Sequence, residues 1–210
     1  MLSLIGHGTY DGSDYKLNMP GADVSATELA SMLDRIPAER QLVVNGTSAS
    51  GASVHALQRP GRTVVTATKS GTEKNATAFP RYWIEALRDP AADSDKNEVI
   101  SALEAFRFAE VKTKQFYESN KRIATEHPML DGGEKQGPVV AARFAVLTLG
   151  SVQMATKDPA KRALLDKREG LEVQIDQLKL QKAAMPTDQY KQQLQTLLLE
   201  LAKTQAELDQ

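Results

Sequence analysis

The sequence predicts an α/β protein in which helices flank a parallel β-sheet, followed by a C-terminal α-helical hairpin or coiled coil. Two observations lead to this fold class. Over residues 1–90, short apolar runs alternate with segments of helical periodicity, which is typical of a parallel sheet with helices on its faces. Over residues 160–210, apolar side chains recur at spacings of three, four and seven, which is typical of long amphipathic helices.

Three apolar runs, residues 2–5, 42–44 and 63–67, are the predicted strands. The first ends in a loop that holds His7 between two glycines, and the second runs into a loop of small residues that contains Ser48. The carboxyl ends of parallel strands meet at one edge of a sheet, so both loops are expected there. Three strands make a thin sheet whose open edge favours association with another chain.

Two helices are predicted beside these strands. The first follows Ser25, which together with Glu28 has the spacing of a capping box, and it ends before Pro37. The second covers residues 76–88, whose aromatic and aliphatic side chains fall on one helical face. Residues 9–23 are polar and rich in turn-forming residues, so they are predicted to be a loop.

The domain organisation follows from changes in composition along the chain. Residues 1–90 are the predicted α/β core, and residues 91–150 are expected to complete it with a polar loop and a helix over residues 99–119. The apolar run at residues 139–149 fits either a helix or a strand. Residues 160–210 form the predicted hairpin.

The hairpin is predicted to be a two-stranded antiparallel coiled coil, either within one chain or shared with a partner. Each arm of about 22 residues would span about 33 Å. A structural arm with a solvated outer face and an arm that docks a partner both fit the pattern. The arms are separated by Pro186-Thr187, and the repeating apolar positions are Leu164, Leu171, Ile175, Leu178, Met185, Tyr190, Leu194, Leu197, Leu201 and Leu208.

Composition excludes several classes of function. The chain has 26 basic and 27 acidic residues, so its net charge of −1 provides no field that attracts nucleic acid or anionic lipid. The absence of cysteine excludes disulfides, thiolate zinc sites and a cysteine nucleophile. No apolar run approaches the roughly 18–20 residues of a membrane span. The apolar run at the N-terminus is too short for a signal peptide, because polar residues follow it at once. A soluble protein is expected, and its compartment stays open.

His7 and Ser48 are the candidate catalytic residues on chemical grounds. His7 is one of three histidines, and the glycines beside it allow a sharp turn that exposes the ring. At a shared sheet edge, its imidazole would act as the base and the Ser48 hydroxyl as the nucleophile. The competing interpretation is an exposed loop histidine near serines, without a function.

The same segments resemble the caspase and legumain clan of cysteine peptidases. In that clan, one strand ends in His-Gly and a later strand ends in (Asp/Glu)-Ala-Cys-x-Ser-Gly. Here His7-Gly8 and Ser50-Gly51 match, Ala49 takes the variable position, and Ser48 stands where the cysteine is expected. Thr66-Ala67-Thr68 resembles a segment that helps line the specificity pocket in legumain-like members.

The resemblance covers residues 1–150 and implies a caspase-like sheet whose N-terminal strands are missing. Either this chain is a fragment, or a complementing subunit or a second copy supplies that edge. A serine hydroxyl is far less acidic than a thiol and needs a base within about 2.6–3.2 Å. The resemblance therefore implies a pseudo-peptidase that serves as a binding or assembly module for a protein or peptide. The alternative is a hydrolase in which Ser48 attacks, His7 is the base, and the amides of Gly8 and Ser48 hold the oxyanion.

Residues 93–104 have the ligand spacing of an EF-hand-like calcium loop. Glu98 stands at the sixth position, where glycine normally permits the sharp turn, so weak affinity for Ca²⁺ is expected. An acidic helix N-terminus without a metal is the alternative. The predicted ligands are Asp93, Asp95, Asn97, the carbonyl of Val99, Ser101 and Glu104.

Overall fold

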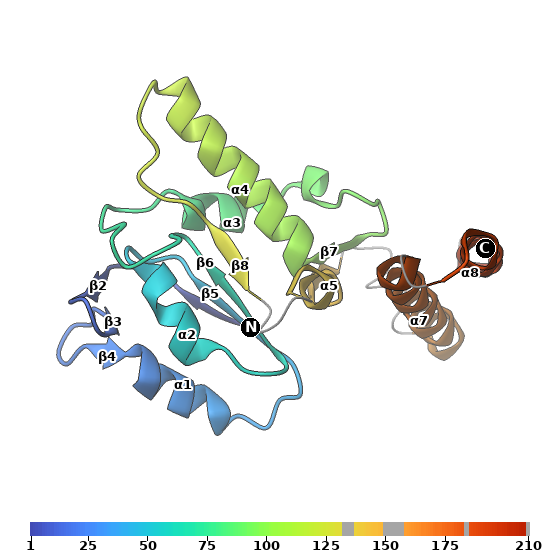
Figure 1. Cartoon of the computed structure of the whole chain (residues 1–210), viewed down its shortest axis with the longest axis horizontal. Helices are drawn as coiled ribbons and strands as arrows, with labels where there is room; N and C mark the ends of the chain where they lie inside the picture. The colour runs from blue at the N-terminus through green and yellow to red at the C-terminus, as the bar shows by residue number, and fades with distance from the viewer. Residues whose placement is uncertain (132–136, 149–157, 183–184, 209–210) are drawn as a thin grey trace. The chain divides into compact units, whose positions relative to one another are not determined.

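The computed structural model describes residues 1–131, 137–148, 158–182 and 185–208, and it shows an α/β protein (Figure 1). The chain divides into two compact units, Met1–Leu147 and Thr148–Gln210. The first unit contains the sheets and the shorter helices, and the second contains two long helices.

The central sheet of the first unit has four strands in the order β1-β5-β6-β8. β5 runs parallel to both β1 and β6, whereas β8 is antiparallel to β6. The prediction of an α/β fold with a sheet flanked by helices is confirmed, but the sheet is mixed because β8 joins it. The strands are β1 (Leu2–Leu4), β5 (Gln41–Asn45), β6 (Arg62–Thr66) and β8 (Met129–Asp131).

One face of this sheet packs against α1 (Ala26–Asp34) and α2 (Val54–Leu57) (Figure 1). Val43 and Val64 lie opposite each other in the register of β5 and β6 and are fully buried. Every residue of β5 and β6 is buried. This explains why the apolar residues of both strands are consecutive in the sequence and do not alternate with polar residues. The core on this face consists of Leu4, Leu29, Leu33, Val43, Leu57 and Val64.

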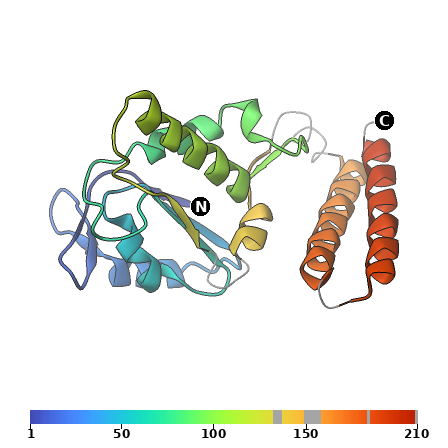
Figure 2. The ribbon, with the colours of Figure 1, turned by 45° about the horizontal axis from the view of Figure 1, so that its top comes forward.

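Helices α3 (Phe79–Ala86) and α4 (Ala102–Ser119) pack together on the other side of the sheet (Figure 2). Phe79 and Trp83 are buried on α3, and the Phe79 ring lies 6.2 Å from the ring of Phe106 on α4. Helix α5 (Gly137–Ala142) contacts β6 and β8. The two helical layers bury both faces of the sheet, which is what its apolar strands require.

Residues 9–23, predicted to be a loop, contain β3 and most of β2, two strands of a second, antiparallel sheet of three strands, so the prediction was wrong for those two segments. A carboxylate oxygen of Asp11 accepts hydrogen bonds from the amides of Ser13 and Asp14, both at 2.9 Å, and this shapes the turn between the first two strands. Strands this short carry too few side chains to show alternation. The strands are β2 (Gly8–Tyr10), β3 (Tyr15–Leu17) and β4 (Val24–Ser25).

Two helices are shorter than predicted. α3 covers fewer residues than 76–88, and α4 begins after Ser101, which caps it through a capping box with Glu104. The residues just before α4 form β7 (Val99–Ser101), which pairs with β9 (Ala145–Thr148). The apolar run at residues 139–149 is therefore helix in α5 and strand in β9, and Leu149 lies outside the described residues.

The second unit contains α7 (Pro159–Gln181) and α8 (Thr187–Leu208), which pack against each other. The start of α7 lies beside the end of α8, since the Lys161 ammonium donates to the Leu208 carbonyl at 3.4 Å. Leu171, Ile175 and Leu178 of α7 are buried. Across the described residues, no helix combines the length and hydropathy needed to cross a membrane.

Candidate functional site

The loops after β1 and β5 meet at one edge of the central sheet, and Gly8 and Ser48 join them. The Gly8 amide donates to Ser48 Oγ at 3.2 Å, and Ser48 Oγ donates in turn to the Gly8 carbonyl at 2.9 Å. Ser48 is only 3% exposed. The serine hydroxyl is thus held by the backbone of the neighbouring loop from both directions.

This approach is possible because residue 8 has no side chain. A Cβ at Gly8 would lie 2.6 Å from the Ser48 carbonyl oxygen and 2.5 Å from the Tyr15 ring. Both distances are well inside van der Waals contact. Glycine at this position therefore has a steric role in holding the two loops together.

The His7 side chain takes no part in this contact. Its ring is exposed, and its backbone carbonyl accepts a hydrogen bond from the Asn18 amide at 3.0 Å. Among the residues that the structure describes, the His7 imidazole has no hydrogen-bond partner. The structure brings Gly8 and Ser48 together but shows no hydrogen bond between the predicted base and the predicted nucleophile.

A network of buried, hydrogen-bonded polar side chains lies next to Ser48. Asn45 and Thr47 are fully buried, and the Thr47 hydroxyl lies 2.6 Å from the Tyr15 hydroxyl and 2.8 Å from Asn45 Oδ1. The Asn45 amide group also donates to Ser53 Oγ at 3.0 Å. Burial raises the pKa of Tyr15 above its usual value, so it stays a neutral donor and acceptor. Such a satisfied network makes the loop rigid.

The residue after Ser48 adopts a left-handed backbone conformation. Ala49 has a φ of 56° and is fully buried, and its amide donates to the Glu73 carbonyl at 2.8 Å. A non-glycine residue in this conformation costs about 1–3 kcal/mol, and such residues are concentrated at functional sites. The loop then turns into a short 3-10 helix, η1 (Ser50–Ser53).

Hydroxyl groups connect this loop to the segment after β6. Ser50 Oγ lies 3.1 Å from Thr68 Oγ1, and the Gly51 amide donates to Thr68 Oγ1 at 2.9 Å. A Cβ at Gly51 would lie 2.3 Å from backbone atoms of Lys69 and Ser70. The segment after β6 thus packs directly on the Ser48 loop.

A glutamate and a second histidine, Glu73 and His127, lie beside this segment, and no sequence pattern singled them out. Glu73 Oε1 lies 2.5 Å from His127 Nδ1, and Glu73 Oε2 accepts the His127 amide at 3.2 Å. This is the carboxylate–imidazole arrangement that orients a base in hydrolases. The backbone carbonyl of Glu73 also accepts the Ala49 amide, so the Glu73–His127 pair borders the Ser48 loop. The partners are 54 positions apart, so no local pattern signals them.

The acidic loop at residues 93–104 brings three of its six predicted ligands together. One carboxylate oxygen each from Asp93, Asp95 and Glu104 lies within 4.8 Å of the others. Asn97 is adjacent, since its amide donates to carboxylate oxygens of both Asp93 and Asp95 at 3.1 Å. Ser101 Oγ is directed to Glu104 in the capping box. No interaction of the Val99 carbonyl with this cluster is seen in the described part of the chain.

The backbone of this loop shows the strain that its sequence predicts. Glu98 has a φ of 63°, and Lys96 has a φ of 57°, both in the region that favours glycine. The Glu98 amide donates to Asp93 at 2.9 Å, which helps hold this conformation.

The carboxylates of the loop affect one another's protonation. Burial and the charge of Glu104 raise the pKa of Asp95. Burial also acts to raise the pKa of Glu104, but hydrogen bonds from Ser101 and Ser94 outweigh it and lower that pKa overall. Clustered oxygen ligands of this kind suit a hard divalent cation, which would relieve the like-charge repulsion.

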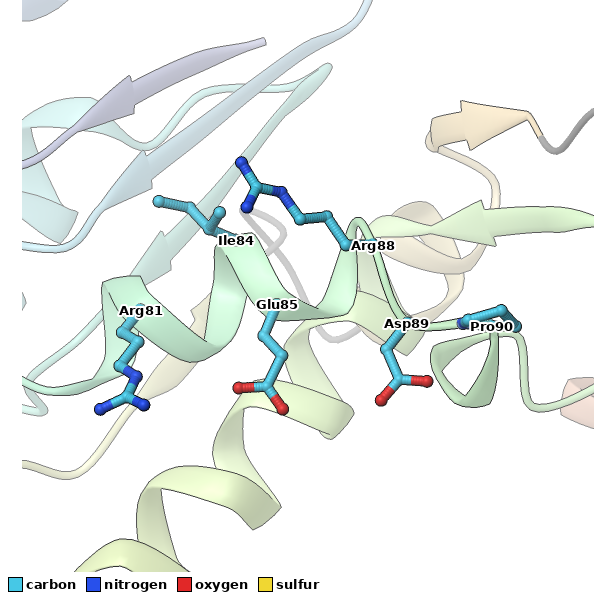
Figure 3. Close-up of a pocket in the computed structure, with 6 residues that line it drawn as sticks. All are labelled: Arg81, Ile84, Glu85, Arg88, Asp89 and Pro90. Carbon is cyan, nitrogen blue, oxygen red and sulfur yellow. The ribbon is translucent and has the colours of Figure 1, made fainter.

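A surface pocket lies elsewhere, along α3. It has a volume of about 610 Å³. In Figure 3, Glu85 and Asp89 point to one side of the helix, and Ile84 and Arg88 point to the other. Its balanced charges favour no particular ligand, and no predicted site residue lines it. The lining residues are Arg81, Ile84, Glu85, Arg88, Asp89 and Pro90.

Comparison with known proteins adds no relative: no family model matches the chain, and neither the curated proteins nor the solved structures include a match.

Proposed function

We propose that residues 1–147 form a caspase- and legumain-like pseudo-peptidase domain that acts as a binding or assembly module for a protein or peptide. The observation that supports this most is the state of the Ser48 hydroxyl. Its proton is donated to the Gly8 carbonyl, and its oxygen accepts the Gly8 amide. A nucleophilic serine instead needs its proton directed to a base.

The surroundings of Ser48 favour the same conclusion. For His7 to act as the base, its exposed ring would have to displace the Gly8 carbonyl as the acceptor of the hydroxyl proton. That would leave a carbonyl without its partner in a buried loop, which costs about 1–3 kcal/mol. A loop held this rigidly is better suited to presenting a fixed surface than to covalent chemistry.

The partner is proposed to be a protein or peptide rather than a nucleic acid. The net charge of −1 gives no general attraction for phosphates. Exposed side chains next to the Ser48 loop, including His7, Thr9 and Lys69, offer polar contacts around a rim of backbone and hydroxyl groups. Extended peptides are recognised at such rims mainly through backbone hydrogen bonds.

The test is covalent labelling and turnover. The chain should release no fluorophore from a peptide substrate library, and a fluorophosphonate probe should leave Ser48 unmodified in a mass-spectrometric peptide map. Ser48→Ala serves as the matched control and should behave like the wild type in both assays. Labelling at Ser48 that disappears in Ser48→Ala would overturn the proposal.

The second candidate is a Ser48 hydrolase, and two observations favour it. The strained Ala49 follows the serine directly, and the Gly8 amide points at Ser48 Oγ, close to where an oxyanion would form. In this case Ser48→Ala abolishes turnover and Ser48→Cys keeps or raises it. Comparing His7→Ala with His127→Ala then shows which imidazole acts as the base. Turnover that is indifferent to both Ser48 variants excludes this candidate.

We also propose that the acidic loop holds Ca²⁺ as a structural ion. Asp93, Asp95 and Glu104 would provide carboxylate oxygens. Asn97 would add its side-chain oxygen, which in this structure accepts the Val99 amide at 2.8 Å. The ion would supply charge neutralisation at the start of α4, distant in sequence from the Ser48 loop. The strain at Glu98 is consistent with weak binding.

A further inference from the structure

The edge of the central sheet at β1 is open. Within the described residues, β1 has one hydrogen-bonded neighbour, β5. In the parallel register, Leu4 lies opposite Asn45, and its carbonyl accepts the Gly46 amide at 2.9 Å. Because alternate residues of a strand bond to alternate sides, the N–H and C=O of Ser3 point away from β5.

This edge is apolar. Residues 1–5 contain no charged side chain and no proline, and Met1 and Ile5 are 62% and 64% exposed. The side chain of Leu4 lies in the core beneath α1 and α2. Since side chains alternate, Ser3 and Ile5 lie on the opposite face, towards α3.

A small apolar pocket adjoins this apolar edge, formed by residues 1–5 and called the β1 patch below, on the side of α3. It holds about 60 Å³ between β1 and α3, and Pro80 and Trp83 form part of its wall. Trp83 is 2% exposed, and its indole N–H has no hydrogen-bond acceptor among the described residues. Ile84 of α3, 37% exposed, borders the same pocket. The helical layer therefore leaves part of the β1 edge uncovered.

The opposite edge of the same sheet is protected. β8 is preceded by Pro128, carries Asp131 bonded to the Gln58 side chain, and is contacted by α5. Proline, charge and a covering helix are the devices by which proteins prevent edge pairing. β1 has none of them, although it belongs to the same sheet.

We propose that a second copy of this chain pairs its β1 with this edge, antiparallel and about a two-fold axis at Ser3. The two four-stranded sheets then form one continuous sheet of eight strands. The two Ser3 residues exchange both backbone hydrogen bonds, with Cα atoms about 5.5 Å apart. Met1 of one copy lies opposite Ile5 of the other, so both exposed side chains become covered.

A second copy fits this surface better than a charged partner. A two-fold interface brings one patch against itself, so any charge on the patch would meet an identical charge. The β1 patch carries no charged side chain, and its outward-facing backbone offers one donor and one acceptor at Ser3, which are complementary to themselves.

The first test is the mass of the full chain by sedimentation and light scattering. The wild type should have twice the monomer mass of 22.9 kDa. Ser3→Pro removes the outward N–H without touching the bonds to β5 and should halve the mass, whereas Ser3→Ala should remain dimeric. Ile5→Lys, which changes an exposed side chain, should also give a monomer and serves if Ser3→Pro fails to fold.

The second test uses the absence of cysteine from the chain. Ser3→Cys should form an interchain disulfide under mild oxidation, because the paired Cα atoms lie within bridging distance. Ser119→Cys, at an exposed position on α4, should not cross-link under the same conditions.

Three outcomes would overturn the proposal. They are a monomeric wild type, a dimer that persists in a folded Ser3→Pro variant, and equal cross-linking of both cysteine variants. A dimer that is lost only when the exposed Leu198 and Leu199 of α8 are changed to Glu assigns the interface to the helix pair instead.

Discussion

Gly8 shows how a single residue can hold the candidate site together. Among the described residues, Gly8 provides the hydrogen bonds between the predicted histidine loop and the Ser48 hydroxyl, one from its N–H and one to its C=O. Tyr15 and Thr47 close around it from the side. The space left for residue 8 is therefore smaller than any side chain.

Gly8→Ala should destabilise the first unit by about 1–3 kcal/mol, because the added methyl would meet the Ser48 carbonyl and the Tyr15 ring. Urea unfolding followed by tryptophan fluorescence measures this, since Trp83 is the one tryptophan of the chain and lies in that unit. Gly170→Ala is the control, because a Cβ at Gly170 meets nothing within 4 Å. An unchanged midpoint for Gly8→Ala would contradict the steric role.

Helix α3 illustrates how one element depends on a distant residue. Its N-cap, Ala78, has no side chain that can accept a hydrogen bond. Glu126 takes that role, accepting the amides of Ala78 at 2.6 Å and Phe79 at 3.1 Å, while Tyr117 donates its hydroxyl at 3.0 Å. The first turn of α3 is satisfied by a carboxylate from the segment before β8, and the helix dipole favours the negative charge there.

The charge of Glu126 should make stability depend on pH. Burial raises the pKa of Glu126 above its usual value, although the hydrogen bonds from Ala78 and Phe79 act against this. The folded state then holds the proton to a higher pH than the unfolded state, so this group lowers the free energy of unfolding as pH rises from about 4.5 through the raised pKa.

Glu126→Gln should remove that decline, and chemical unfolding at a series of pH values measures it. Glu118→Gln, which changes an exposed acid on α4, should retain the wild-type slope. If the wild type and Glu126→Gln lose stability equally over this range, Glu126 is not the responsible group.

At the scale of the whole molecule, every predicted catalytic and metal-binding residue falls in the first unit. The proposals about Ser48, Ca²⁺ and the β1 edge therefore concern one compact body, and α7 and α8 form a separate one. A ligand that binds only the folded state stabilises the unit that contains its site.

Millimolar CaCl₂ should therefore raise the melting temperature of the chain relative to a chelator. If free Ca²⁺ exceeds the Kd about tenfold, the gain is about 1.4 kcal/mol, or about 3–6 °C for a chain of this size. Asp95→Asn should abolish the shift, and Asp166→Asn, in the exposed surface of α7, should retain it. Identical melting with calcium and with chelator would remove the ion from the proposal.

Sequence patterns predicted those parts of the fold whose signals are local. The strands at residues 42–44 and 63–67 are recognisable because both faces are buried and the runs are continuous, and they correspond to β5 and β6. The Ser25 and Glu28 spacing correctly marks the start of α1. Ser101 and Glu104 have the same spacing, but their assignment as ligands concealed the capping box that starts α4.

Contacts between distant segments could not be predicted in this way. The Glu73–His127 pair and the Glu126 cap join residues about fifty positions apart, and neither partner changes the local pattern around the other. For the candidate site, the sequence indicated that the His7 and Ser48 loops would meet. It gave no sign that the Gly8 backbone, rather than the His7 ring, would bond to the hydroxyl.

The sequence by itself determined which segments are apolar enough to be buried and where helices start, because periodicity and capping depend on residues within a few positions of each other. Only the tertiary structure decided the hydrogen-bond partner of Ser48, the carboxylate that caps α3, and which sheet edge is left open. Those outcomes depend on how the packing of helices on the sheet brings separate loops together. A buried polar group without a hydrogen bond costs free energy, so each such group pairs with a partner that the packing places beside it.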